Sequence, residues 1–290
     1  MKALEHPRYL LNFWLNKESI PMLELHQFEA SHYSEKVRLI LDYKQLPYKT
    51  IEVSPGIGQI ELYRLSGQRQ VPVLKDGAEV VPDSTAIARY LEEKYPERPV
   101  IPTDSKQRGL CLMMEAWADE SIGLNARKAM IGAFNQHPNF RTSLLPLSTP
   151  ELVKNAVSAV PSDLLKLLGT GVGFGGDAVT QATDILRQDL ESLCLILSTQ
   201  PYLCGEQPTL ADFAVAGLSM YLKFPSALYV DLPAGIGGKG VPGLVDDPAF
   251  TAFWEWRDRL YSDFRKPRTP TGMGSSSTGA SSGPVSIGID

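Results

Sequence analysis

The stretch VPVLKDGAEVVPDSTAIARYL, residues 71–91, reads as two short apolar strands followed by a helix. Asp76-Gly77 separates the two strands, and Asp-Gly between apolar runs is the strongest short-range signal for an antiparallel hairpin. Asp83 and Ser84 then open a segment whose apolar residues recur at helical spacing, and both residue types are favoured at helix N-termini. The stretch therefore predicts a hairpin and a helix that close a small α/β unit.

The residues upstream supply the rest of that unit. MLELHQF (22–28) alternates apolar and polar residues as a half-buried strand does, and SEKVRLILDYKQ (34–45) has a helical apolar stripe, with Ser34 as the expected N-cap. A second strand is expected at 46–53 and a short helix at 58–66. The resulting order, β-α-β-α-β-β-α, is the thioredoxin-like arrangement, and it assigns residues 22–95 to one domain.

The rest of the chain shows a different pattern. A proline-rich linker (96–106) is followed by residues 107–268, which show no strand alternation and predict an all-α domain. Its helices are expected at 107–136, 150–169, 178–199, 209–224 and 247–264. Residues 1–21 are interpreted as an N-terminal extension, and the Gly/Ser/Thr-rich residues 269–290 as a flexible, disordered tail.

Composition excludes several classes of function. The 290 residues include 28 basic and 33 acidic ones, so no basic excess favours nucleic acid as a partner. No apolar run approaches the ~20 residues that cross a bilayer. Three cysteines and four scattered histidines predict neither a disulfide framework nor a metal site.

Four segments together resemble the cytosolic glutathione transferases, in particular zeta-, theta- and omega-like members, including cyanobacterial and algal ones. They are SHYSEKVRLILDYKQLPY (31–48), QVPVLKDG (70–77), DSTAIARYL (83–91) and PTLADFAVAGL (208–218). Their order and spacing match the family over residues 22–266. The resemblance implies a thioredoxin-like N-terminal domain, an all-helical C-terminal domain, and a cytoplasmic homodimer that acts in detoxification. Its implied reaction joins glutathione, as co-substrate and without a metal, to a small hydrophobic electrophile.

The resemblance places Ser31 at the position that stabilises the glutathione thiolate, because Arg38 aligns with the family's helix arginine. A free thiol has a pKa of about 8.5, so a hydroxyl donor at a helix N-terminus would increase the thiolate fraction at neutral pH. Tyr33 and Ser34 are alternatives because a short loop can shift in register. Ser31 and Ser34 can also be plain turn and N-cap residues.

The same loop has no cysteine, since Cys111, Cys194 and Cys204 all lie in the predicted helical domain. Exchange of disulfides through a protein thiol is therefore disfavoured, and the expected enzyme is of the serine, hydroxyl type. The three cysteines are interpreted as small buried or partly buried side chains.

The glutathione backbone is expected to bind beside Val71-Pro72, which the resemblance predicts to be cis, with Gln70 alongside. Asp83 is expected near the γ-glutamyl ammonium and Ser84 near the γ-glutamyl carboxylate, at a helix N-terminus that favours anions. If these residues have no binding role, Pro72 is only a proline at the start of a strand, and Asp83 and Ser84 form an ordinary helix cap. Arg69 or Gln68 is a weaker candidate for the glycyl carboxylate.

Thr209 and Asp212 form a T-x-x-D capping box, interpreted as a folding element of the helical domain. The electrophile is expected between the domains, against apolar side chains of two helices. The candidates are Met113, Met114, Trp117, Ile122, Tyr221 and Phe224.

Two other functions fit the same fold. One is a non-catalytic binding or assembly module. It is favoured by the unusual loop SHYS (31–34) and by Asp83, since the family usually has Glu or Gln at that position. The other is a glutathione-dependent isomerase or dehalogenase, in which only the substrate pocket differs.

Overall fold

The computed structural model describes residues 22–54, 57–143, 150–160, 176–232 and 235–268. Its first part contains seven elements in the order that the sequence predicts. They are β1 (Leu23–Gln27), α2 (His32–Tyr43), β2 (Tyr48–Glu52), α3 (Ile57–Ser66), β3 (Val73–Asp76), β4 (Glu79–Pro82) and α4 (Ser84–Lys94). The thioredoxin-like fold of this part, called the α/β part below, is confirmed.

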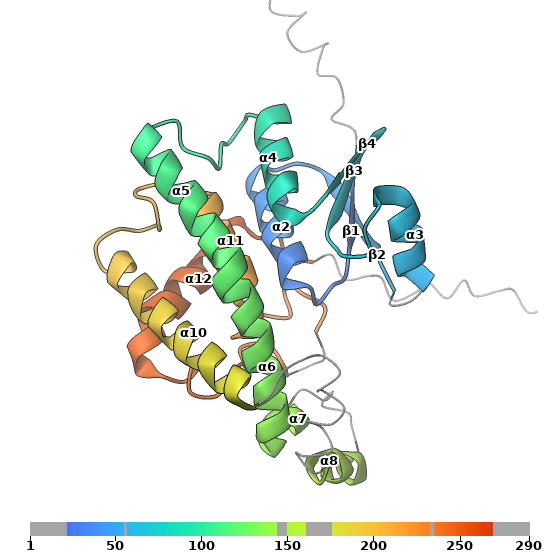
Figure 1. Ribbon diagram of the computed structural model, residues 1–290, viewed down its shortest axis with the longest axis vertical. Coiled ribbons are helices and arrows are strands. Elements are labelled where there is room, and N and C mark those ends of the chain that lie inside the picture. Colours follow the sequence, from blue (N-terminus) through green and yellow to red (C-terminus); the bar gives the residue numbers. More distant parts are fainter. Residues whose placement is uncertain (1–21, 55–56, 144–149, 161–175, 233–234, 269–290) are drawn as a thin grey trace, which may run out of the picture.

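The four strands form one sheet in the order β2-β1-β3-β4. β1 runs parallel to β2 and antiparallel to β3, and β3 and β4 form the predicted hairpin. Gly77 turns the hairpin at a φ of 61°, which only glycine adopts without strain. α2 and α4 cover the face of the sheet that meets the other helices, and α3 covers the opposite face (Figure 1).

The second part, called the helical part below, has no strand among its described residues. Its elements are α5 (Ser105–Trp117), η1 (Ala118–Gly123), α6 (Leu124–Gln136), α7 (Pro138–Ser143), α8 (Glu151–Ser158), α10 (Gly176–Leu197), α11 (Leu210–Leu218), η3 (Ser219–Tyr221), η4 (Pro248–Phe250) and α12 (Thr251–Phe264). The all-helical character is confirmed, whereas α7 was not predicted. Residues 161–169 of one predicted helix, and the two predicted terminal segments, lie outside the described residues.

The predicted helix over residues 209–224 is shorter in the structure. α11 ends at Leu218, and the single turn η3 continues only to Tyr221. Beyond it the chain leaves the helix, because Lys223 forms an antiparallel bridge with Gly240. The sequence keeps its helical periodicity beyond Tyr221, but there the chain forms the bridge to Gly240 instead of another helical turn.

α11 is the centre of the helical part, and all nine of its residues are buried. It packs directly on α2, so close that a Cβ atom on Gly217 would lie 2.6 Å from the backbone nitrogen and Cα of Lys36. A larger residue at 217 would push the two helices apart. The α/β and helical parts therefore share one continuous core.

The predicted capping box at the start of α11 is present. The backbone N–H of Thr209 donates to Asp212 Oδ2 at 2.8 Å, and the backbone N–H of Leu203 donates to Asp212 Oδ1 at 2.8 Å. Asp212 is completely buried, and this burial raises its pKa to about 6 although three hydrogen bonds to Leu203 and Thr209 oppose the shift. The carboxylate thus ties the preceding loop to the central helix.

None of the helices among the described residues combines the length and the apolar character that a membrane span requires.

Candidate functional site

A pocket of about 620 Å³ lies between the α/β and helical parts. The α/β part contributes the loop before α2, the segment before β3 and the start of α4, while the helical part contributes η1, α6 and η3. Its lining includes Phe28, Ser31, His32, Tyr33, Val53, Gln59, Gln68, Arg69, Gln70, Val71, Pro72, Asp83, Ser84, Asp119, Glu120, Leu124, Arg127 and Tyr221. Of the residues that the sequence predicts for the thiol and for the tripeptide, only Ser34 is outside this lining.

Ser31 is the N-cap of α2, and its Oγ accepts a hydrogen bond from the backbone N–H of Ser34 at 3.2 Å. The prediction that Ser34 caps the helix is therefore wrong. Both serines suit a cap, but the helix starts three residues earlier, and Ser34 is fully buried inside it with a hydroxyl that finds no partner among the described residues. A serine that accepts one hydrogen bond can still donate another. Ser31, 8% exposed at the pocket wall, can thus donate to a ligand.

The peptide bond between Val71 and Pro72 is cis, as the family resemblance implies, and both residues line the pocket. Pro72 lies directly before β3, so the chain reaches the sheet from the pocket side. Gln70 lies beside them, and its carbonyl oxygen accepts a hydrogen bond from Gln68 Nε2 at 3.1 Å.

Asp83 is the N-cap of α4, with Oδ1 accepting from the backbone N–H groups of Thr85 and Ala86, each at 2.9 Å. Its φ of 74° is unusual for a residue with a side chain, and such backbone strain concentrates at functional sites. Ser84 is buried at the first turn of the same helix and lines the pocket. The arrangement presents a helix N-terminus, which attracts anions, beside an exposed carboxylate.

Two aromatic residues of α2 bridge to the helical part. The hydroxyl of Tyr33 donates to the carbonyl oxygen of Asp119 at 3.2 Å, and Nε2 of His32 lies 3.1 Å from the carbonyl oxygen of Gly123. Burial, together with the carboxylates of Asp119 and Glu120, raises the pKa of Tyr33 to about 12. Burial lowers the pKa of His32 to about 4, although its hydrogen bond to Gly123 opposes the shift. Both groups are therefore neutral at pH 7.

A buried lysine joins three elements beneath the pocket. Lys36 Nζ is 2.6 Å from Glu115 Oε1, 2.8 Å from Asp119 Oδ1 and 3.2 Å from Thr85 Oγ1. Its side chain has no exposure, so each of these partners offsets part of the cost of burying a charge. The contacts hold α2 against α4 and against the α5-η1 boundary, beside the pocket residues Ser84 and Asp119.

Most of the residues predicted to contact the electrophile do not line this pocket. Tyr221 lines the pocket, but Met113, Met114, Trp117, Ile122 and Phe224 do not, and Leu124, Glu120 and Arg127 take their place. The sequence predicted a regular helix over 107–136, whereas residues 118–123 form the π-helical turn η1. A π turn inserts extra residues and rotates every later side chain about the helix axis. The turn therefore displaces the face expected from residue 118 onward, including Ile122, but it does not account for Met113, Met114 and Trp117, which precede it.

The three cysteines lie away from the pocket. Cys111 and Cys204 are buried, Cys194 is partly exposed, and none of them lines the space around Ser31. Among the described residues, no group of three or more His, Cys, Asp and Glu side chains is arranged to hold a metal ion.

Family models match both parts of the chain. The glutathione S-transferase N-terminal domain matches residues 25–99, and the glutathione S-transferase C-terminal domain matches residues 164–259. With the fold described above, these matches show that the chain belongs to the glutathione S-transferase superfamily.

The chain is also similar to curated proteins and to solved structures. A zeta-class glutathione S-transferase of Euphorbia esula is 38% identical over 93 residues, 31% of this chain and 41% of the relative. FtsZ-localized protein A of Caulobacter vibrioides is 25% identical over 72% of this chain and 82% of its own. Maleylpyruvate isomerase of Ralstonia sp. is 27% identical over 66% and 77%. The fold matches the beta-etherase LigF of Sphingobium sp. strain SYK-6 with a TM-score of 0.61 at 21% identity, over 83% and 95% of the two chains.

Proposed function

We propose that the protein is a glutathione transferase of the hydroxyl type, which binds glutathione in the pocket of Ser31 and adds its thiolate to small hydrophobic electrophiles. The observation that carries this proposal is the convergence of three groups on one pocket. Ser31, the cis Val71-Pro72 bond and the Asp83-Ser84 helix start lie far apart in sequence but line the same 620 Å³ space. The match covers only 41% of the length of the zeta-class relative, so the whole activity is a proposal.

The cysteinyl backbone and the two charged groups of the γ-glutamyl residue each have a chemically suited partner in this pocket. The backbone of Val71 can pair with the cysteinyl backbone as an added strand would. The N-terminus of α4, with the Ser84 hydroxyl, suits the γ-glutamyl carboxylate, and the exposed Asp83 suits the ammonium group. Gln70 lies next to Val71 and is placed for a further polar contact. In this pose the thiol reaches towards the start of α2.

Ser31 is the hydroxyl best placed to stabilise the thiolate. The N-terminus of α2 adds a partial positive charge at the same position. Tyr33 already donates its hydroxyl proton to Asp119, and Ser34 is buried away from the pocket. With no cysteine in this loop, the proposed reaction is addition of glutathione to an electrophile rather than exchange of disulfides.

The electrophile would lie on the helical side of the pocket, against Phe28, Leu124 and Tyr221. Apolar and aromatic surfaces there favour a small hydrophobic molecule. A homodimer, a cytoplasmic location and a role in detoxification belong to the proposal because they are usual for this family.

The test combines retention on immobilised glutathione with turnover of a model aryl halide. Ser31→Gly is the informative variant, because glycine at an N-cap costs the helix only a few tenths of a kcal/mol whereas alanine costs about 1 kcal/mol. We expect Ser31→Gly to retain glutathione binding and lose at least about tenfold in turnover at pH 7, where the thiolate fraction limits the rate. Unchanged turnover would contradict the role of Ser31.

The second candidate is a non-catalytic binding or assembly module. It is favoured by the similarity to FtsZ-localized protein A, which spans more of this chain than the zeta-class match does. Retention of the native protein on glutathione without any turnover, or no retention at all, would support this candidate. The third candidate is a glutathione-dependent isomerase or dehalogenase, which the similarity to maleylpyruvate isomerase favours. Glutathione binding with isomerase or dehalogenase activity but no conjugation would support it.

A further inference from the structure

The loop that carries Ser31 is held by an arginine of the following helix. Arg38 Nη2 donates to the carbonyl oxygen of Glu29 at 2.8 Å, and Arg38 Nη1 donates to Gln27 Oε1 at 2.6 Å. Within the loop, the backbone N–H of Ser31 donates to the carbonyl oxygen of Phe28 at 2.8 Å. Arg38 therefore holds the backbone at Glu29, two residues before Ser31. The Arg38 side chain is only 2% exposed.

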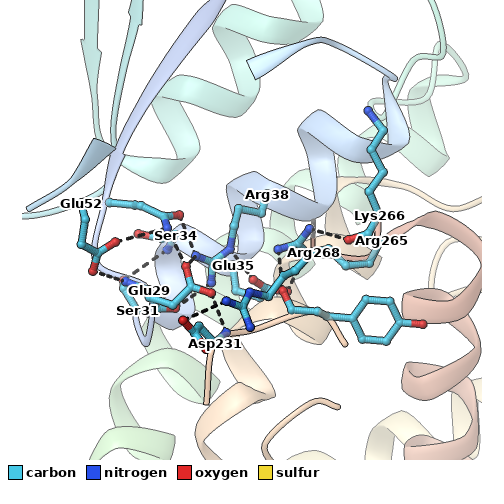
Figure 2. Close-up of polar contacts among 12 residues, drawn as sticks. Glu29, Ser31, Ser34, Glu35, Arg38, Glu52, Asp231, Arg265, Lys266 and Arg268 are labelled. Carbon is cyan, nitrogen blue, oxygen red and sulfur yellow. Dashed lines mark hydrogen bonds and ion pairs between the residues drawn. The ribbon is translucent and has the colours of Figure 1, made fainter. Parts of the chain in front are cut away.

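Arg38 is in turn oriented by Glu35. Its Nε donates to Glu35 Oε2, and the second oxygen, Oε1, accepts from Arg265 Nε at 3.0 Å. Figure 2 shows Glu35 between the two guanidinium groups. A guanidinium that is bound through several nitrogens is fixed in orientation as well as in position, because its donors form a rigid plane.

Arg265 follows α12, and 230 residues separate it from Glu35 in the sequence. Its Nη1 donates to Asp42 Oδ2 at 2.6 Å, and its Nη2 donates to the carbonyl oxygen of Tyr229 at 3.1 Å. The backbone N–H of Lys266 also donates to Asp42 Oδ2, at 3.0 Å. Each of the three guanidinium nitrogens of Arg265 therefore donates a hydrogen bond, and together these bonds connect α2 to the helical part.

The charges in this cluster depend on one another. Burial raises the pKa of Glu35, but Arg265 and Arg38 outweigh burial and hold that pKa below its usual value. Loss of Arg265 would leave Glu35 with one cation and Asp42 with the more distant Lys266, whose Nζ is 4.0 Å away. A buried carboxylate short of a partner rearranges or takes up a proton, and either change loosens its hold on Arg38.

We propose that Arg265 is a positioning residue of the glutathione site, which acts through Glu35 and Arg38 to fix the loop that places Ser31. This inference rests on the proposed function. Arg265 does not line the pocket of Ser31, and it borders a separate cavity of about 810 Å³. Its effect is therefore on the geometry of the Ser31 hydroxyl and not on direct contact with glutathione.

The experiment compares Arg265→Gln with Arg257→Gln. Arg257 is a matched control, since it is a buried arginine of α12 that donates to the carbonyl oxygen of Lys223 and has no contact with Arg38 or Glu35. The first measurement is hydrogen–deuterium exchange at the amides of Glu29, Ser31 and Ser34. We expect exchange in this loop to be at least about tenfold faster in Arg265→Gln and unchanged in Arg257→Gln. Unchanged loop exchange in Arg265→Gln would overturn the inference, whether or not glutathione binds.

The second measurement is the pKa of the thiol of bound glutathione, from the ultraviolet absorbance of the thiolate. In Arg265→Gln we expect it to rise by about one unit, a tenfold loss of thiolate below the pKa. The dissociation constant for glutathione should change by less than about threefold, because Val71 and Ser84 are untouched. Arg265→Lys, which keeps the charge, should recover part of the shift.

Equal shifts in Arg257→Gln would contradict a specific role for Arg265. If the native protein binds no glutathione, the proposed function fails, and loop exchange alone decides the inference.

Discussion

The hydroxyl of Tyr33 and the carbonyl oxygen of Asp119 lie 3.2 Å apart, in a hydrogen bond that crosses from α2 to the π turn η1. The hydroxyl donates its only proton to this bond, and a pKa of about 12 keeps that proton in place at neutral pH. Tyr33 therefore acts as a tether between the α/β and helical parts. Of the three hydroxyls predicted for the thiol, this geometry leaves that of Ser31 at the pocket wall and able to donate.

Replacement of Tyr33 by phenylalanine removes the tether and keeps the ring. We expect the free energy of unfolding to fall by about 1 kcal/mol, the usual net value of one hydrogen bond, and conjugation at pH 7 to stay within about threefold of the native rate. Urea unfolding and the aryl halide assay measure the two effects. A loss of about a hundredfold in conjugation, with the pH profile moved upward, would identify Tyr33 as the thiol donor instead.

His32 makes stability depend on pH in a defined direction. Its pKa is about 4 when folded because of burial, and about 6.5 when unfolded, so between these values the unfolded chain binds the extra proton. The stabilisation is complete above pH 6.5 and is lost as the pH falls towards 4. In His32→Gln, which retains a donor for Gly123, acidification from pH 7 to 5 should cost about 2 kcal/mol less than in the native protein. Urea midpoints at both pH values measure this difference, and equal losses in the two proteins would contradict it.

Asp212 should be the more costly of two helix caps to remove. Asp212→Ala leaves the buried N–H groups of Leu203 and Thr209 without an acceptor, and we expect a loss of about 2–4 kcal/mol in the free energy of unfolding. Asp104→Ala is the control, because Asp104 caps the start of α5 at the surface through the N–H of Gln107 and should cost about 1 kcal/mol. Equal losses would show that burial of the capping box adds nothing.

Local patterns in the sequence predicted most of the α/β part, and the family resemblance predicted several pocket residues. Asp76-Gly77 needs only its neighbours to specify a hairpin, and the order of strands and helices follows from periodicity. Val71-Pro72 and Asp83-Ser84 were identified as binding residues through the family resemblance, because each pair belongs to a short motif of the family at the end of one element. Their common pocket was implied by the family resemblance, and the structure brings them together.

What the sequence did not predict depends on packing between distant segments. Two serines three residues apart both suit an N-cap, and only the tertiary structure selects Ser31 over Ser34. Glu120 and Arg127 reach the pocket because the π turn shifts the helical register, a change that a regular period cannot reveal. The contact of Arg265 with Glu35 joins residues 230 positions apart, and no motif links the two residues.

The most direct test of the central claim is the structure of the protein crystallised with glutathione. We expect the glutathione sulfur within about 3.5 Å of Ser31 Oγ and the cysteinyl backbone paired with the backbone of Val71. A sulfur that contacts the Tyr33 hydroxyl instead, or a pocket that stays empty at saturating glutathione, would contradict the claim.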